Sequence, residues 1–276
     1  MRAALLQLCS GDDPEANLAA TRSLIAEAAV AGAGFVLTPE VTNCVSASRE
    51  RQAQVLCREA DDPTLAALRD AARARGLWLL IGSLALKAEG EGQPFVNRSF
   101  LIGPDGAIAA RYDKIHMFDV DIDATESYRE SAGYRPGTQA VLAQTPFAQI
   151  GMTVCYDVRF PALHQSLALA GAQIFTAPAA FSPVTGAAHW HTLLRARAIE
   201  TGCFVLAPAQ TGTHASAAHK TRDTYGHSLA IDPWGEILLD AGQEPGVYFF
   251  DMDMEQCASA RRRVPSLANR RTFSNP

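Results

Sequence analysis

The segment Gly151-Met152-Thr153-Val154-Cys155-Tyr156-Asp157-Val158-Arg159-Phe160-Pro161 is the most informative part of the chain. Residues 150–154 are almost wholly apolar and rich in β-branched side chains, which predicts a buried strand. The strand ends at Cys155, and Pro161 opens an apolar run with helical periodicity. In α/β proteins, reactive groups gather at the carboxyl ends of strands. We therefore expect Cys155 to be functional, with nearby backbone N–H groups favouring its thiolate form.

The composition is that of one globular protein. The 276 residues are 48% hydrophobic and 19% charged, enough for a single large core. The formal net charge is −5, and only two arginine clusters occur, at 261–263 and 270–271. We interpret both as solvated surface, which argues against a nucleic-acid partner. Because no apolar run is long enough for a membrane span or signal peptide, we expect a cytoplasmic protein without membrane contact.

The cysteine pattern predicts free thiols. No two of the six cysteines have the spacing of a zinc site, and the chain is too long for a small disulfide framework. Cys9 and Cys203 lie in apolar, strand-like runs and are expected in the core. The six are Cys9, Cys44, Cys57, Cys155, Cys203 and Cys257.

Strands alternate with helices in both halves of the chain, which predicts two mixed sheets covered by helices. Asp13-Pro14-Glu15 and Asp62-Pro63 are typical helix starts. No change in composition marks a linker, so we expect one domain over residues 1–265 and a tail over 266–276. The polar connection 118–139 is long enough to be functional or a lid.

Three predicted strands end in side chains that suit acyl transfer. Glu40 follows the apolar run 35–38, Lys114 follows 108–113, and Cys155 ends the strand described above. A thiol can act as the nucleophile, and a carboxylate can take its proton. An ammonium can stabilise the oxyanion, aided by the backbone N–H after the nucleophile. Each residue alone has an ordinary structural explanation, so the prediction depends on the three together.

Three segments then resemble the signature blocks of the nitrilase superfamily of carbon–nitrogen hydrolases. They are Pro39-Glu40, Tyr112-Asp113-Lys114-Ile115-His116 and Val154-Cys155-Tyr156-Asp157-Val158-Arg159-Phe160-Pro161, in the family's order. The resemblance extends over nearly the whole chain. It implies an α/β fold, a four-layer α-β-β-α sandwich, and a homodimer or higher oligomer in which the layers continue as α-β-β-α-α-β-β-α. The helices expected over 161–170 and 189–200 are the usual interface elements.

The resemblance also implies a Glu-Lys-Cys triad formed by Glu40, Lys114 and Cys155. A second glutamate positions the lysine in this family, and Glu130 matches it better than the competing Glu126. The implied reaction forms a cysteine thioester, releases ammonia and hydrolyses the thioester, with Tyr156 supplying an oxyanion N–H. No cofactor and no metal are needed.

A metal site at His189-Trp190-His191 is not favoured, because helical residues two apart point to different faces.

Three positions, 159, 181 and 185, are candidates for substrate binding. The segment 180–190 resembles the branch of the family that contains ω-amidases and deaminated glutathione amidases. In that branch, positions matching Arg159, Phe181 and Thr185 hold an α-keto-acid end of the substrate. A guanidinium suits a carboxylate, although Arg159 has the alternative of a structural pair with Asp157 or a family glutamate. We therefore expect a small amide substrate that bears a carboxylate.

Within the branch, 194–201 and 225–228 look closer to the deaminated glutathione amidases. The polar segment 214–224, with Lys220 and Arg222, would suit a longer, tripeptide-like substrate. Residues 122–125 lack a Pro-Gly often found there. We rank deaminated glutathione amidase first, α-ketoglutaramate ω-amidase second, and a nitrilase or N-carbamoyl amino acid amidohydrolase third.

Two alternative functions, from other classes of protein, stay open. The chain can be a non-catalytic binding protein on the same fold, although such a protein is expected to lose part of the triad. It can also be an unrelated Cys-His hydrolase that uses His116 or His164 as the base.

Overall fold

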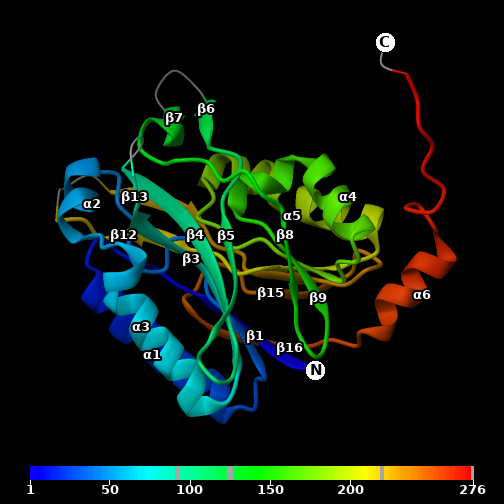
Figure 1. Cartoon of the computed structure of the whole chain (residues 1–276), viewed down its shortest axis with the longest axis horizontal. Helices are drawn as coiled ribbons and strands as arrows, with labels where there is room; N and C mark the ends of the chain where they lie inside the picture. The colour runs from blue at the N-terminus through cyan, green and yellow to red at the C-terminus, as the bar shows by residue number, and fades with distance from the viewer. Residues whose placement is uncertain (91, 93, 123–126, 218–220, 275–276) are drawn as a thin grey trace.

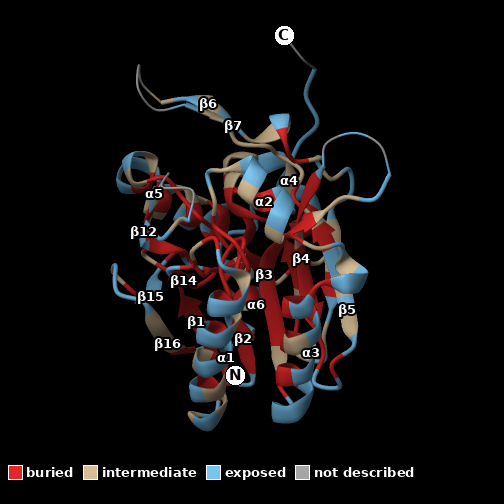
Figure 2. Cartoon of the chain, turned by 90° about the vertical axis from the view of Figure 1, so that its left-hand side faces the viewer, coloured by how far each residue is buried: buried red, intermediate tan, exposed pale blue. Residues whose placement is uncertain are grey.

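Two six-stranded sheets lie face to face between helices, which makes the predicted four-layer α-β-β-α sandwich (Figure 1). The structure is a computed structural model that describes residues 1–90, 92, 94–122, 127–217 and 221–274. Buried residues fill the space between the layers, and exposed residues line the outer helix faces (Figure 2). No described helix is long and apolar enough to cross a membrane.

The first sheet has the order β16-β1-β2-β3-β4-β5, with β1, β2 and β3 parallel and the outer pairs antiparallel. Its outer face is covered by two helices that pack on each other. The elements are β1 (Arg2–Gln7), α1 (Pro14–Val30), β2 (Phe35–Leu37), α3 (Pro63–Arg75), β3 (Trp78–Lys87), β4 (Phe95–Ile102), β5 (Ile108–Asp113) and β16 (Gly246–Asp251).

The second sheet has the order β15-β14-β11-β10-β9-β8, and α4 and α5 cover its outer face. Its strands are β8 (Val141–Gln144), β9 (Gln149–Met152), β10 (Ile174–Thr176), β11 (Phe204–Ala207), β14 (Leu229–Ile231) and β15 (Ile237–Asp240). The helices are α4 (Pro161–Leu169) and α5 (Pro183–Thr201). The remaining elements are α2 (Arg49–Val55), η1 (Glu59–Asp61), β6 (Asp119–Asp121), β7 (Ser127–Arg129), η2 (Glu130–Ala132), η3 (Cys155–Arg159), β12 (Thr211–His214), β13 (Arg222–Tyr225) and α6 (Glu255–Arg263).

Strand alternation divides the core into layers. Leu5, Leu37, Leu80 and Leu101 are paired in register across the first sheet, and all four pack in the cluster between the sheets. Their neighbours along each strand point the other way and pack under α1 and α3. Because successive strand residues face opposite sides, strands buried on both faces must be apolar throughout. Burying each leucine contributes about 1.5–3 kcal/mol.

The helix starts predicted at Asp13 and Asp62 are confirmed. The Asp13 carboxylate accepts the N–H groups of Glu15 and Ala16, and Asp62 accepts the N–H of Leu65 at 2.7 Å. Both helices carry proline at the first position, where no N–H partner is needed. Local side-chain chemistry therefore sets these two boundaries.

Other local predictions need correction. Cys9 is exposed rather than in the core, because β1 ends at Gln7 and the chain has left the sheet two residues later. Cys203 is buried, as expected. Helix α5 begins at Pro183, six residues before the expected start at His189. The segment 118–139 contains the short pair β6–β7, and 214–224 joins β12 to β13 and overlaps the ends of both strands, so neither is a plain loop.

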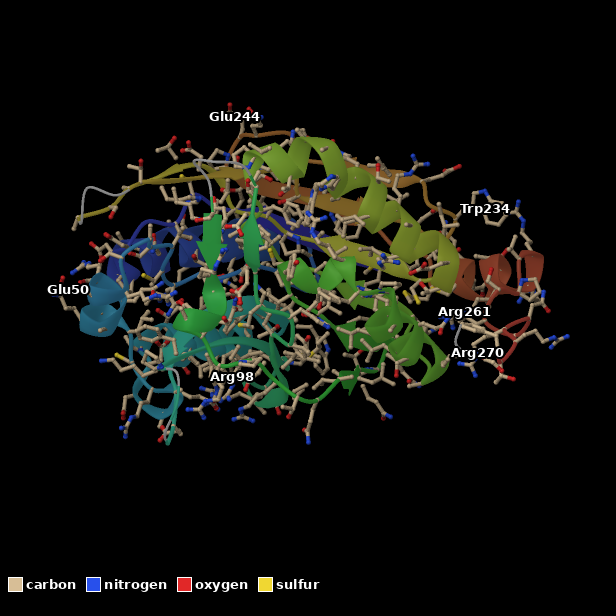
Figure 3. The ribbon with its side chains drawn as sticks, turned by 90° about the horizontal axis from the view of Figure 1, so that it is seen from above. Glu50, Arg98, Trp234, Glu244, Arg261 and Arg270 are labelled. Atoms are coloured by element: carbon tan, nitrogen blue, oxygen red, sulfur yellow. The ribbon has the colours of Figure 1, made fainter. Side chains whose placement is uncertain are left out.

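The first arginine cluster is not simply solvated surface. The Arg261 guanidinium donates to the carbonyl oxygens of Thr201 at 3.0 Å and Ala172 at 2.6 Å, and so ties α6 to the ends of neighbouring elements. Arg263 lies 3.6 Å from the Trp234 ring centroid. Trp234 and Arg261 are at the same end of the molecule, opposite α2 and Glu50 (Figure 3). Arg261 and Arg263 therefore help to dock helix α6 on the rest of the protein.

Gly82 allows the two sheets to approach each other beside the strand end that carries Glu40. A Cβ there would lie 2.5 Å from the Cβ of Pro178 and 2.7 Å from the Pro39 carbonyl oxygen, with the Thr38 oxygen closer still. Real Cβ contacts this short do not occur, and backbone cannot easily move aside in a packed core. Only glycine therefore fits at this position.

We expect Gly82→Ala to lower the free energy of unfolding by about 3 kcal/mol, the upper range for overpacking a core. Gly34→Ala is the matched control, since its Cβ would meet nothing closer than 3.8 Å. Urea unfolding of both variants provides the measurement. Equal stabilities for the two variants would show that the sheets do not depend on close approach at Gly82.

Candidate active site

Glu40 lies three residues after β2 and is buried, with 4% of its surface exposed. Its Oε1 accepts hydrogen bonds from Asn97 Nδ2 at 2.8 Å and Lys114 Nζ at 2.9 Å. Its Oε2 accepts the backbone N–H of Ala180 at 2.8 Å. The thiol of Cys155 is a further hydrogen-bond partner of this carboxylate. Glu40 is thus held from several sides in one orientation.

Lys114 follows β5 and is 2% exposed. Its Nζ donates to Glu40 Oε1 at 2.9 Å and to the two Glu130 oxygens at 3.0 and 2.9 Å. Burial alone would lower the pKa of Lys114, but the charges of Glu130 and Glu40 outweigh it and hold the pKa well above its usual value. Lys114 is therefore a permanent cation within the site.

Glu130 belongs to the short turn η2 within the polar connection. Besides Lys114, its Oε2 accepts the backbone N–H of Phe118 at 2.6 Å, which closes the connection onto the lysine. The competing candidate Glu126 lies outside the described residues. Among the described residues, Glu130 is the second carboxylate that contacts Lys114.

Cys155 follows β9 and the extended residues 153–154, and its φ is +49°. Non-glycine residues rarely adopt this left-handed conformation, and it commonly marks functional positions. The Cys155 N–H donates to the Pro178 carbonyl oxygen at 2.9 Å, which fixes the turn against the neighbouring strand. The Cys155 side chain therefore points to Glu40 and does not follow the alternating side-chain directions of strand β9.

The expectation of a thiolate at Cys155 is wrong for the resting site. Burial and the adjacent negative charge of Glu40 raise the pKa of the thiol well above its usual value, and Lys114 only partly opposes them. Burial also raises the pKa of Glu40, but Lys114 and the Cys155 hydrogen bond bring the net pKa below its ordinary value. The site therefore holds a carboxylate beside a neutral thiol, which suits proton transfer on attack.

Asp157 is fully buried and ties the nucleophile turn to the segment around the lysine. Its Oδ2 accepts the Val154 N–H at 2.8 Å and the Tyr112 hydroxyl at 2.7 Å. Its Oδ1 accepts the His116 N–H at 3.1 Å and lies 2.7 Å from His116 Nδ1. These partners flank Cys155 and Lys114 along the chain, so one carboxylate sets both positions. Asp157 does not pair with Arg159, so the Asp157 part of the structural alternative for Arg159 is wrong.

The triad residues line a cavity of about 870 Å³. Tyr156 and Phe181 also line it, and Tyr156 packs edge-on against Phe118 at 5.1 Å. A cavity of this volume admits a ligand larger than a minimal amide. The site thus combines enclosed acid–base groups with room for substrate.

The other two predicted substrate residues, Arg159 and Thr185, are not among the residues that line the cavity. The Arg159 guanidinium lies 5.4 Å from the Phe181 ring centroid and 5.9 Å from that of Tyr156, with Nη2 3.2 Å from His189 Nδ1. Thr185 lies in the first turn of α5, and its hydroxyl is buried without a hydrogen-bond partner among the described residues. Neither residue lines the cavity, but Arg159 contacts two residues that do.

Neither alternative histidine base is placed to serve Cys155. His164 is buried, its Nδ1 lies 3.1 Å from the Phe160 carbonyl oxygen, and burial lowers its pKa to about 4. His116 is engaged with Asp157. An imidazole with so low a pKa is a weak base at neutral pH.

One group of described residues has the donor atoms for a metal ion. His191, His227 and Asp240 offer two imidazole nitrogens and a carboxylate oxygen within 4.8 Å of one another. His191 Nε2 and His227 Nδ1 already hydrogen-bond to Asp240, at 2.9 and 2.8 Å. None of the three lines the cavity, and His189 is not part of the group.

Sequence reasoning missed three groups at the site: Asn97, Asp157 and the Ala180 backbone. Asn97 left a usable signal, since it is a polar residue within the apolar strand β4. Asp157 was visible only as a possible partner for Arg159. Ala180 left no signal, because every residue except proline carries an N–H group.

Comparison with known proteins gives consistent matches. Residues 2–262 match the sequence model of the carbon–nitrogen hydrolases. The chain is 42% identical to the deaminated glutathione amidase of Yersinia enterocolitica, over 99% of this chain and 93% of that protein. The crystal structure of the C. elegans NitFhit protein has 34% identity and a TM-score of 0.89, covering 98% of this chain and 65% of that longer chain.

A third match is a Nesterenkonia amidase mutant, with 29% identity and a TM-score of 0.80, over 98% of this chain and 94% of that one. In that structure the acetamide moiety of fluoroacetamide is covalently added to the active-site cysteine.

We expect Asp157→Asn to lower both stability and activity. An amide places a donor against the Val154 N–H or the His116 N–H, so a buried donor loses its acceptor, at a cost of about 1–3 kcal/mol. The exposed Asp70→Asn, which alters only a surface ion pair with Arg73, is the matched control. Thermal unfolding and amide turnover of both variants provide the measurements. Unchanged values for Asp157→Asn would contradict its positioning role.

Proposed function

This chain belongs to the carbon–nitrogen hydrolase family, and on that premise we propose that it hydrolyses a linear amide through a thioester on Cys155. The observation that best supports this proposal concerns the Glu40 carboxylate. It accepts hydrogen bonds from both the nucleophile thiol and the Lys114 ammonium at the wall of one cavity. That arrangement supplies a nucleophile, its base and a cation without any further group.

In the first half of the reaction, Glu40 takes the thiol proton as Cys155 Sγ attacks the amide carbonyl carbon. Lys114 and the Tyr156 N–H stabilise the negative charge on the carbonyl oxygen. Glu40 then gives its proton to the amide nitrogen, the C–N bond breaks, and the amine leaves. The acyl group remains on sulfur as a thioester.

In the second half, water attacks the thioester carbonyl while Glu40 again acts as base. The tetrahedral intermediate is stabilised by the same donors and collapses with release of the acid. The proton returns from Glu40 to Cys155 Sγ, which restores the starting state. Glu130 keeps Lys114 aligned during both steps through its 2.9 and 3.0 Å contacts.

For the substrate, we propose deaminated glutathione, which the names of several relatives specify. Its amides join acyl groups to substituted amines, so an amine rather than ammonia leaves; ammonia release applies to primary amides such as α-ketoglutaramate. Phe181, which lines the cavity, would pack against the α-keto-acid end. Arg159, which contacts the Phe181 ring, and Thr185 would hold this end only after turning toward the cavity. The six free thiols support a reducing compartment, the cytoplasm, for this reaction.

We also propose a homodimer formed through the α4–α5 face. Large apolar side chains are exposed on these two helices: Leu169 is 44%, Val184 54% and Ile199 52% exposed. The two helices pack side by side over the second sheet. An exposed apolar group of this kind favours burial against a second copy.

We expect Glu40→Gln to lower kcat/KM for an amide by about 10²–10⁴-fold, because the amide side chain cannot take the thiol proton. Glu89→Gln, at an exposed position, is the control. Turnover is followed through release of the keto acid and of the amine. Activity within a few fold of the unmodified enzyme would favour the Cys-His alternative.

For the dimer, the double substitution Leu169→Lys with Ile199→Lys is expected to shift the mass in solution from twice 29.5 kDa to 29.5 kDa. Two charges cannot be buried at an apolar contact without partners. Val30→Lys is the matched control, because Val30 is an exposed final residue of α1 on the opposite layer. Light scattering after size exclusion measures the mass, and an undisturbed dimer in the double variant would place the interface elsewhere.

A further inference from the structure

Arg222 carries a positive charge that forms no ion pair in the described part of the chain. It is the first residue of β13 and is half-buried. Its Nη2 donates to the Ala180 carbonyl oxygen at 2.7 Å, while its buried Nε has no hydrogen-bond partner. Arg222 takes part in none of the ion pairs formed among the described residues, although its charge acts on the Glu40 carboxylate. Partly buried cations are normally paired, so this one has unused capacity for an anion.

The residue lines the same cavity as Cys155. Its guanidinium lies 5.8 Å from the ring centroid of Tyr128, another lining residue. The two other arginines of this wall are already occupied: Arg129 pairs with both oxygens of Asp121 at 2.8 Å, and Arg49 donates to the Arg129 carbonyl at 2.7 Å. Arg222 is therefore the arginine of this wall that can best accept an anionic group.

Ala180 places Arg222 on the leaving-group side of the reaction. The Ala180 N–H binds Glu40 Oε2, and its C=O binds Arg222 Nη2, so one residue separates the base from the guanidinium. In the proposed reaction Glu40 must protonate the departing amine, so that amine lies next to Glu40. A group attached to the amine then extends past Glu40 toward Arg222.

We infer that Arg222 is the centre of a second anion-binding subsite, which holds a carboxylate on the amine half of the substrate. This inference rests on the proposed function and names the residue that recognises the amine half of that substrate. The enzyme should therefore distinguish amides by the charge at the end of the amine half. The cavity volume of about 870 Å³ is sufficient for such a two-part substrate.

The test compares three amides that share one α-keto-acid acyl half. One is the primary amide, one is joined to a peptide-like amine ending in a carboxylate, and one carries the same amine ending in a carboxamide. We expect the enzyme to prefer the carboxylate over the carboxamide by roughly tenfold or more in kcat/KM, as a charge-assisted pair would produce. Arg222→Gln should bring this ratio close to one, and Arg222→Lys should retain part of it.

Arg49→Gln is the matched control, because it removes another arginine of the same wall and should keep the ratio. Because the carboxylate and the carboxamide substrates use the same base, any effect of Arg222 on Glu40 through Ala180 changes both kcat/KM values equally. Such an effect therefore leaves the ratio of the two values unchanged. A ratio near one in the unmodified enzyme, or an unchanged ratio in Arg222→Gln, would overturn the subsite. Failure to hydrolyse any of the three amides would instead reject the proposed function.

Discussion

A buried carboxylate that stays ionised is the constraint on which the site depends. Removing Glu40 from water favours its neutral form, and a neutral carboxyl could not take a proton from Cys155. The Lys114 ammonium, the Asn97 amide and the Ala180 N–H replace the lost hydration, at 2.8–2.9 Å each. Burial, together with the charge of Glu40, raises the pKa of the Cys155 thiol and keeps it protonated in the resting site. The base is thus prepared by its surroundings, while the nucleophile is activated only during attack.

The sandwich brings these partners together because the strands that carry them, in both sheets, end at the same edge of the molecule. Glu40 and Lys114 extend from the first sheet, and Cys155 and Ala180 come from the second. The distance between the sheets must be small here, which explains a glycine at position 82. Asp157 then links the nucleophile turn to the residues around Lys114. Packing and hydrogen bonding therefore act together to position groups that are far apart in sequence.

Backbone groups extend the site beyond the triad. Ala180 joins Glu40 to Arg222 through its N–H and its C=O, so the base and the proposed anion subsite share one rigid connection. Arg159 contacts the rings of Tyr156 and Phe181, which line the cavity, but does not line it itself. Of these two guanidinium groups, Arg222 lines the cavity directly, and Arg159 reaches it only through the rings that it contacts.

Local sequence determined the strand ends, the helix starts at Asp13 and Asp62, and the residue types that carry the chemistry, because periodicity and capping act within a few positions. It could not determine that Cys9 is exposed, that α5 starts at Pro183, or that Cys155 is left-handed and protonated. Nor could it identify the partners of Glu40, Asp157 and Arg222. Those contacts join positions up to 170 residues apart, and they form only when the two sheets pack.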